Sequence, residues 1–115
     1  MKTYTGQTGY VYQYYFVGKR VAMPDDPDAP AIEYIFDVTA DRKTIFAVSV
    51  FLKQSALDEW KAAHARALTD PEQYAAAKLR LFQGFDEVDK MQASGRRLAI
   101  EGTAIESLLE QLGVD

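Results

Sequence analysis

The stretch that decides the fold is YVYQYYFV, residues 10–17. It holds five aromatic residues, more than a third of those in a chain with 7 tyrosines, 6 phenylalanines and 1 tryptophan. In an extended strand, successive side chains point to opposite faces of the sheet. One face then carries Tyr10, Tyr12, Tyr14 and Phe16, and the other carries Val11, Gln13, Tyr15 and Val17. Neither face is polar overall, so we expect both to be covered by something.

Tyrosine indicates what could cover the aromatic face of this stretch. A buried hydroxyl needs a hydrogen-bond partner, and tyrosine is therefore most at home where one end is dry and the other is wet, as at interfaces. We predict an interface or ligand platform made of Tyr10, Tyr12, Tyr14 and Phe16. A second copy of the chain is the leading cover, because twofold homodimers are the commonest oligomers. Cover by the N-terminal tail or by the acidic loop, burial as ordinary core, and stacking of a sugar or base remain open alternatives.

The composition indicates one folded domain. A chain of 115 residues can bury roughly two-thirds of the surface that its unfolded form exposes. Hydrophobic residues make up 48% and charged residues 26%, as in ordinary globular proteins. Residues 1–8 are polar and contain glycine, so we expect a flexible N-terminal tail rather than an export signal. Together with the absence of cysteine, this predicts a soluble, cytoplasmic protein.

The charge balance bears on the class of partner. The chain has 13 basic and 17 acidic residues, a formal net charge of −4. Such a chain has no general attraction to phosphate backbones, so nucleic acid is not an expected partner. No apolar run approaches the roughly 18 residues of a membrane span, which argues against a membrane partner. Another protein remains a possible partner besides a second copy.

The first half of the chain predicts strands. The run from Gly9 to Met23 fits either a hairpin that turns at Gly18 or one long bent strand with a bulge there. Residues 24–30 contain three prolines and predict a loop. Alternation then predicts strands at 32–38 and 44–52, and an odd-length connection would place Val38 opposite Phe46.

The second half of the chain predicts helices and one short strand. Ser55 with Asp58 is typical of a helix start, as is Asp70 followed by Pro71. The second helix is expected to kink or stop at Gly84. A short strand at 97–101 and a closing helix from 103 to a glycine cap at 113 complete the order. This order predicts an α+β fold: an antiparallel sheet, mainly from the N-terminal half, with two to three C-terminal helices packed on one face.

Two polar residues are candidates for a ligand site. His64 is the only histidine and falls on the apolar stripe of its helix with Leu57, Trp60 and Leu68. Asp37 is an acidic residue within a strand. Either could serve as the polar handle of a tyrosine-lined pocket between sheet and helices. No local spacing of residues marks a nucleophile, a catalytic triad or a phosphate-binding loop, so no catalytic residue is assigned.

The acidic residues do not predict a metal site. Asp25, Asp26 and Asp28 lie in the proline-rich loop, which lacks the glycine and distal glutamate of an EF-hand, and we interpret them as solvated turn residues. Glu33 and Asp37 lie four apart on one strand, about 13 Å at ~3.3 Å per residue, which is too far for a glycosidase pair. We interpret this pair as solvent-facing. No metal and no cofactor are expected.

Taken together, these patterns favour a small, non-enzymatic protein-interaction or regulatory module that self-associates through its tyrosine-rich strand. The alternative is a small-molecule-binding protein or modest enzyme with a tyrosine-lined pocket. The two readings use the same residues 10–16 and differ in what covers them.

Overall fold

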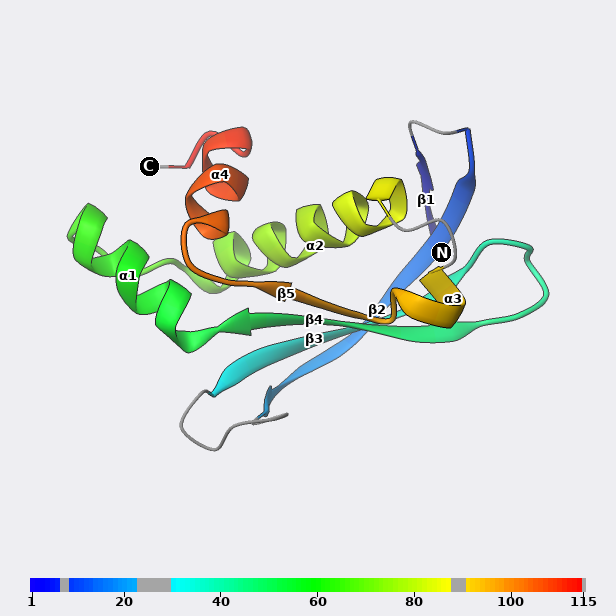
Figure 1. Cartoon of the computed structure of the whole chain (residues 1–115), viewed down its shortest axis with the longest axis horizontal. Helices are drawn as coiled ribbons and strands as arrows, with labels where there is room; N and C mark the ends of the chain where they lie inside the picture. The colour runs from blue at the N-terminus through cyan, green and yellow to red at the C-terminus, as the bar shows by residue number, and fades with distance from the viewer. Residues whose placement is uncertain (7–8, 23–29, 88–90, 115) are drawn as a thin grey trace.

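The computed structural model describes residues 1–6, 9–22, 30–87 and 91–114, and within these ranges five strands form one sheet in the order β1-β2-β3-β4-β5 (Figure 1). Helices lie over one side of this twisted sheet, and the fold is α+β as predicted. The elements are β1 Lys2–Thr5, β2 Val11–Ala22, β3 Ala31–Thr39, β4 Phe46–Lys53, α1 Gln54–His64, α2 Asp70–Glu87, α3 Met91–Ser94, β5 Arg97–Ile100 and α4 Ala104–Gln111.

The sheet is mixed rather than wholly antiparallel. β1 to β4 pair antiparallel with their sequence neighbours, whereas β5 pairs parallel to β4. Parallel neighbours need a long crossover, and here α1, α2 and α3 supply it. The sequence predicted the short strand, but the prediction of an antiparallel sheet is wrong for β5, because the helical connection is long enough to return the chain parallel to β4.

The hairpin of β3 and β4 has the predicted register. Val38 lies opposite Phe46, and Tyr34 lies opposite Val50. These side chains point toward the helices and are all buried, as are Phe36 and its partner Val48. The hydrophobic alternation therefore selects the correct loop parity, because a shift by one residue would turn the apolar side chains to the other face.

β2 is one long strand with a bulge, which decides between the two alternatives that the sequence left open. Its register against β3 shifts between Phe16 and Gly18, so two residues of β2 there match one step of β3. Before the shift Phe16 lies opposite Phe36; after it Lys19 lies opposite Tyr34 and Arg20 opposite Glu33. The bulge thus changes which face each later residue of β2 occupies.

The expectation of a flexible tail at residues 1–8 is wrong for Lys2–Thr5, which form β1; residues 7–8 lie outside the described residues. The reason is Tyr4. Its ring stacks on Phe82 of α2 with centroids 4.4 Å apart, and its hydroxyl donates to Asp86 Oδ2 at 2.7 Å. That hydrogen bond to a carboxylate, with burial and the negative charge, raises the pKa of Tyr4 to about 12. One aromatic side chain therefore anchors an otherwise polar segment to the helix.

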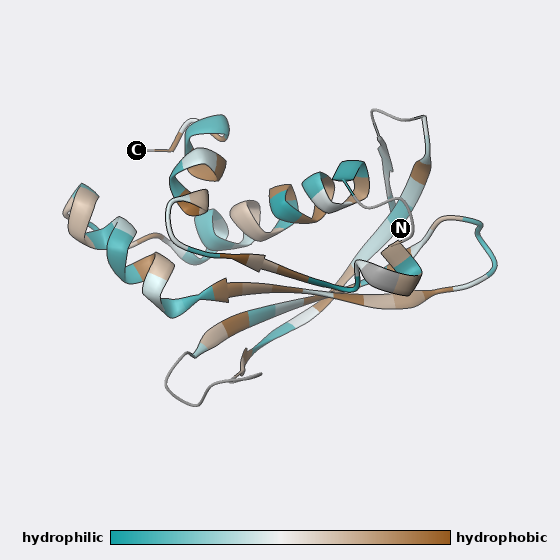
Figure 2. Cartoon of the chain, in the orientation of Figure 1, coloured by the Kyte–Doolittle hydropathy of each residue, from teal (hydrophilic) through white to brown (hydrophobic). Residues whose placement is uncertain are grey.

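The core lies between the sheet and the apolar faces of the helices. Trp60 of α1, Leu81 of α2 and Ile105 of α4 are among its fully buried side chains. Figure 2 shows hydrophobic residues along β4 and β5, and hydrophobic residues alternating with hydrophilic ones around the helices. No helix within the described ranges is long and apolar enough to cross a membrane.

The helix ends differ in detail from the predicted caps. α1 begins at Gln54 with Lys53 as its N-cap and no side-chain capping bond, so Ser55 is not the cap. α2 is capped by Thr69: Glu72 N donates to Thr69 Oγ1, and Thr69 N donates to Glu72 Oε1 at 2.9 Å. This reciprocal pair is a capping box one residue earlier than Asp70. The predicted glycine cap of α4 is confirmed, with Gly113 at φ 74.

Thr69→Ala is expected to lower the free energy of unfolding by about 1 kcal/mol, because it removes the side-chain acceptor at the N-terminus of α2. Thr69→Ser keeps the hydroxyl and serves as the matched control. Urea unfolding followed by circular dichroism measures both. A larger loss for Asp70→Ala than for Thr69→Ala would contradict the assignment of Thr69 as the cap.

Gly84 does not end α2, one of the two outcomes that the sequence predicted, since the helix continues to Glu87. A Cβ built on Gly84 would lie 2.7 Å from Leu98 Cδ1 and 3.0 Å from Met91 Cε. The glycine therefore allows α2 to approach β5 and α3 closely. Its cost in helix propensity is offset by the packing it permits.

Gly84→Ala is expected to lower the free energy of unfolding by about 1 kcal/mol, because an overpacking cost of ~1–3 kcal/mol exceeds the gain in helix propensity of ~1 kcal/mol. The double-mutant cycle with Leu98→Ala provides the control. In the Leu98→Ala background the loss should shrink or reverse, because both Leu98 methyl groups are gone and only the Met91 Cε contact at 3.0 Å remains. A stabilising Gly84→Ala in the wild-type background would show that the contact is not tight.

Candidate functional site

The face of β2 that the sequence singled out is turned toward α2. Tyr12 and Tyr14 are each only 4% exposed. The Tyr12 ring stacks on Phe85 with centroids 4.3 Å apart and planes at 5°, and Tyr14 meets Phe82 edge-on at 5.4 Å. The sequence left open whether this strand is core, interface or ligand platform, and Tyr12 and Tyr14 are core residues.

The other two residues of the predicted platform are less buried. Phe16 is half-buried and packs at 4.9 Å against the Tyr74 ring of α2. Tyr10 is 62% exposed and directly precedes β2. The predicted platform is therefore divided, with only Tyr10 largely accessible.

Three exposed apolar side chains of β2 lie on the opposite face, the side of the sheet that faces away from α1, α2 and α4, which we call the open face. Val11 is 43% exposed, Tyr15 58% and Val17 52%. Tyr15 lies opposite Asp37 of β3, and Asp37 in turn lies opposite Ala47 of β4. The sequence offered one signal for this orientation: Gln13, the one polar residue in residues 10–17, belongs to this face.

The centre of the open face holds a buried carboxylate. Glu33 is 6% exposed, which corrects its interpretation as solvent-facing. It accepts a hydrogen bond from Arg20 Nε at 2.8 Å and another from Ser49 Oγ at 2.6 Å. Arg20 reaches it because the bulge places the two residues opposite each other. Regular alternation through Gly18 would have turned Arg20 to the helix side, so the sequence pattern alone hid this contact.

The electrostatic balance keeps Glu33 ionised. Burial raises the pKa of Glu33, but the hydrogen bonds from Arg20 and Ser49 and the charges of Arg20 and Arg97 together outweigh it. The pKa of this carboxyl therefore lies below its ordinary value of 4.5. Beside it, the Arg97 guanidinium lies over the Phe51 ring, 4.8 Å from the centroid, and Phe51 is the cross-strand neighbour of Glu33.

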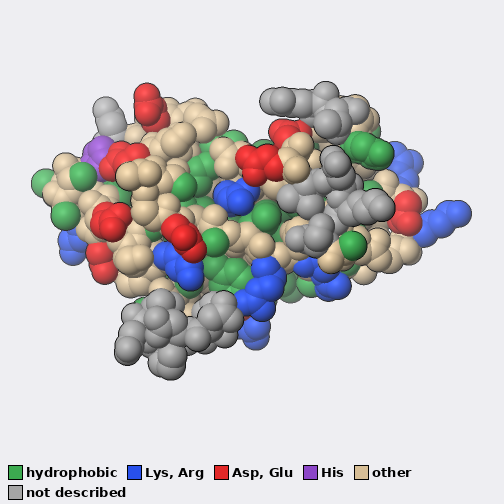
Figure 3. Space-filling view, viewed as in Figure 1, with side chains coloured by type: hydrophobic (Ala, Val, Ile, Leu, Met, Phe, Trp, Pro, Cys, Tyr) green, Lys and Arg blue, Asp and Glu red, His purple; other side chains and the backbone are tan. Residues whose placement is uncertain are grey.

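The two predicted polar handles do not meet the tyrosines in one site. His64 stacks on Trp60 at 4.2 Å, and its Nε2 lies 2.9 Å from Glu106 Oε1 of α4. It lines a cavity of about 350 Å³ between α1 and α4. Asp37 is half-buried on the open face. Figure 3 shows acidic side chains gathered over the end of the molecule where α1 and α4 lie, which is also where His64 contacts Glu106.

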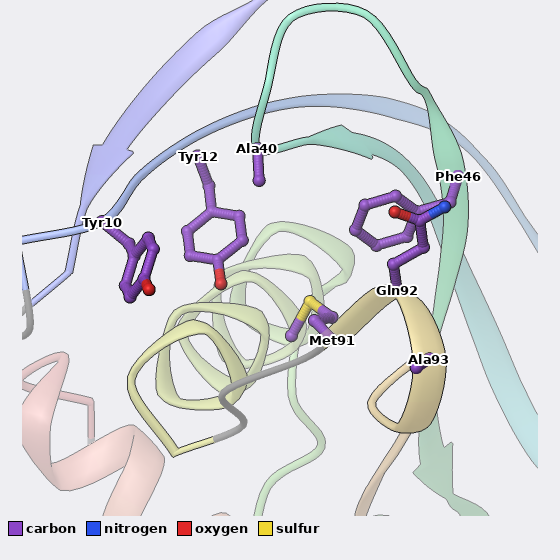
Figure 4. A pocket seen from close by; sticks show the side chains of 7 residues that line it. All are labelled: Tyr10, Tyr12, Ala40, Phe46, Met91, Gln92 and Ala93. Carbon is purple, nitrogen blue, oxygen red and sulfur yellow. The ribbon is translucent and has the colours of Figure 1, made fainter.

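A larger cavity, of about 480 Å³, does bring tyrosines together (Figure 4). It lies between the start of β2, the end of the β3 hairpin and α3. Tyr10 and Tyr12 line it, as do Phe46 and Met91, whereas His64 and Asp37 do not. Phe46 and Met91 were not among the predicted site residues, and no sequence signal connects them to Tyr10.

The described residues contain no group of three His, Asp or Glu side chains placed to hold a metal ion. Asp25, Asp26 and Asp28 lie outside the part of the chain that the structure describes. Comparison with protein-family models, curated proteins and solved structures finds no match to this chain. Function must therefore be inferred from the geometry of the chain itself.

Glu33→Gln is expected to lower the free energy of unfolding by about 1.5–3 kcal/mol at neutral pH, because charge-assisted hydrogen bonds are lost. The pKa of Glu33 in the folded state is lower than 4.5, so its stabilisation is complete above that pH and lost as the pH falls below it. The difference between variant and wild type should shrink over that window in urea unfolding.

The matched control is Glu59→Gln, which changes an exposed carboxyl on α1 and should leave stability nearly unchanged. A stability difference for Glu33→Gln that stays constant from neutral pH to well below 4.5 would contradict the ionic role of Glu33.

Proposed function

We propose that this protein is a protein-interaction or regulatory module that works by binding, and that two copies associate through the open face along β2. The observation that carries the proposal is the row of exposed apolar side chains Val11, Tyr15 and Val17 on the side of the sheet facing away from the helices. The proposed location is the cytoplasm, because a chain without cysteine needs no oxidising compartment to form disulfides.

Exposed apolar residues concentrate on one segment. Among the described residues, eight large hydrophobic side chains are exposed, and six of them lie within residues 1–21. They are Met1, Tyr10, Val11, Tyr15, Val17 and Val21. Single exposed apolar residues are ordinary, but Val11, Tyr15 and Val17 lie together on the open face of one strand, which is typical of an interaction surface, and tyrosine is enriched at interfaces.

The face of β2 is a better contact surface than its edge. β1 pairs with β2 as far as Tyr14, and residues 15–22 of β2 extend past the end of β1. This edge carries a bulge at 16–18 followed by Lys19 and Arg20, features by which natural proteins discourage edge-to-edge pairing. The open face beside it has no comparable protection around Tyr15. Association is therefore face to face.

The charges of the open face suit a second copy of the same chain. Arg20 and Arg97 are matched there by Glu33 and Asp37. Lys53, which lies on the same face, has its Nζ 4.0 Å from Glu101 Oε1, so these six charges sum to zero. The whole chain carries −4, which makes most of its surface repel an identical copy. Two copies repel least where the charge is balanced, and a twofold contact places the same patch on both sides.

Light scattering after size-exclusion chromatography, over a dilution series, tests the proposal. Wild type should show twice the chain mass, and Tyr15→Lys should weaken the dimer at least ~30-fold, as expected for an aromatic interface residue worth about 2 kcal/mol. Tyr10→Lys is the matched control, because Tyr10 is equally exposed but lies at the cavity rather than on the open face.

A wild-type protein that is monomeric at every concentration would reject self-association. A dimer weakened by Tyr10→Lys but not by Tyr15→Lys would show that the contact does not lie on the open face, and would reject this part of the proposal. Thermal unfolding of each variant confirms that both exposed positions tolerate the change.

A further inference from the structure

The cavity beside α3 has a built wall and an exposed one. Three lining residues belong to the core: Tyr12 is 4% exposed, Phe46 6% and Met91 1%. Tyr12 is held by its stack on Phe85, so its ring is fixed before any ligand arrives. Tyr10, at 62% exposed, forms the outer side. A site that is mostly preformed loses little conformational entropy when it is filled.

The side chains surround an open space rather than fill it. Figure 4 shows the rings of Tyr10 and Tyr12 on one side, the ring of Phe46 on the other, and the Met91 sulfur below and between them. Gln92 of α3 extends its amide beside Phe46. The volume of about 480 Å³ falls within the roughly 300–1,000 Å³ typical of small-molecule sites.

The chemistry of the lining selects the class of ligand. Every side chain that lines the cavity among the described residues is uncharged, and none of them would offset the cost of desolvating an ionic group. Three aromatic rings and a thioether favour a flat aromatic partner, since rings stack on rings and sulfur packs well against ring edges. The Tyr10 hydroxyl and the Gln92 amide can form hydrogen bonds to one polar atom of a ligand.

We propose that this cavity binds a neutral aromatic small molecule of one or two fused rings, which lies between Tyr10 and Phe46 and rests on Met91. The site is independent of the proposed self-association, because Tyr15 and Val17 lie on the open face and line no part of it.

Titration of the full chain with indole, followed by two-dimensional ¹H–¹⁵N NMR, tests this site. Indole is a neutral pair of fused rings with one N–H group. Saturable shifts are expected in the amide signals of Tyr10, Tyr12, Phe46, Met91 and Gln92, with a Kd on the order of 1 mM, as suits a ligand of this size. Monomeric Tyr15→Lys protein should give the same result, which separates this test from that of self-association.

Two substitutions at exposed positions change the cavity without reaching the core. Ala40→Phe places a ring in the space and should abolish the saturable shifts, and Tyr10→Ala should weaken binding about 5-fold through the loss of one stacking partner. Ala63→Phe on α1 and Tyr15→Ala are the matched controls, with similar exposure away from the cavity. The spectrum of each free variant reports whether it is folded.

Three outcomes overturn the proposal. The first is the absence of saturable shifts with indole in wild type. The second is binding that survives Ala40→Phe or that falls equally in Tyr15→Ala, which would place indole elsewhere. The third is equal or tighter binding of indole-3-carboxylate, or displacement of indole by a tryptophan-containing peptide at lower concentration, which would assign the cavity to an anion or to a protein side chain.

Discussion

The structure depends on one layer of aromatic rings between α2 and the first strands of the sheet. Phe82 and Phe85 lie three residues apart on α2 and so share one side of the helix. Phe85 stacks on Tyr12 at 4.3 Å, and Phe82 stacks on Tyr4 at 4.4 Å. These contacts decide which side of β2 is inside. Because both sides of that strand are largely apolar, its alternation offered only the signal of Gln13, and packing against the helix decides which side is buried.

The bulge at 16–18 is the second decisive feature, because it divides β2 into two halves with different facing. In the first half the even-numbered residues Tyr12 and Tyr14 point to the helices, and beyond the bulge Arg20 points to the open face. A buried carboxylate, Glu33, acquires its partner in this way. The bulge thereby brings a guanidinium to a buried, ionised carboxylate, and this opposite charge offsets the cost of removing the carboxylate from water.

Residues 10–17 consequently serve three environments. Tyr12 and Tyr14 stabilise the core, Tyr15 and Val17 present an apolar row on the open face, and Tyr10 borders the cavity beside α3. The packing of Tyr12 and Tyr14 in the core determines the other two environments. Because stacked rings hold one side of the strand against α2, the remaining side chains point in defined directions. Both proposed binding surfaces therefore rest on the same packing contact, yet they use different side chains on different sides of the molecule.

The sequence by itself determined what depends on local periodicity. The strand at 32–38, its register with Phe46 and Val48, and the glycine end of α4 follow from alternation and from the conformational freedom of glycine. Only the tertiary structure decided the face of β2, the order of β1, the parallel direction of β5 and the contact between Arg20 and Glu33. Each of these depends on residues that are distant in sequence: Tyr4 with Phe82, or Gly84 with Leu98. A pattern read along the chain records the neighbours of each residue, but it does not record which segment folds back to cover them.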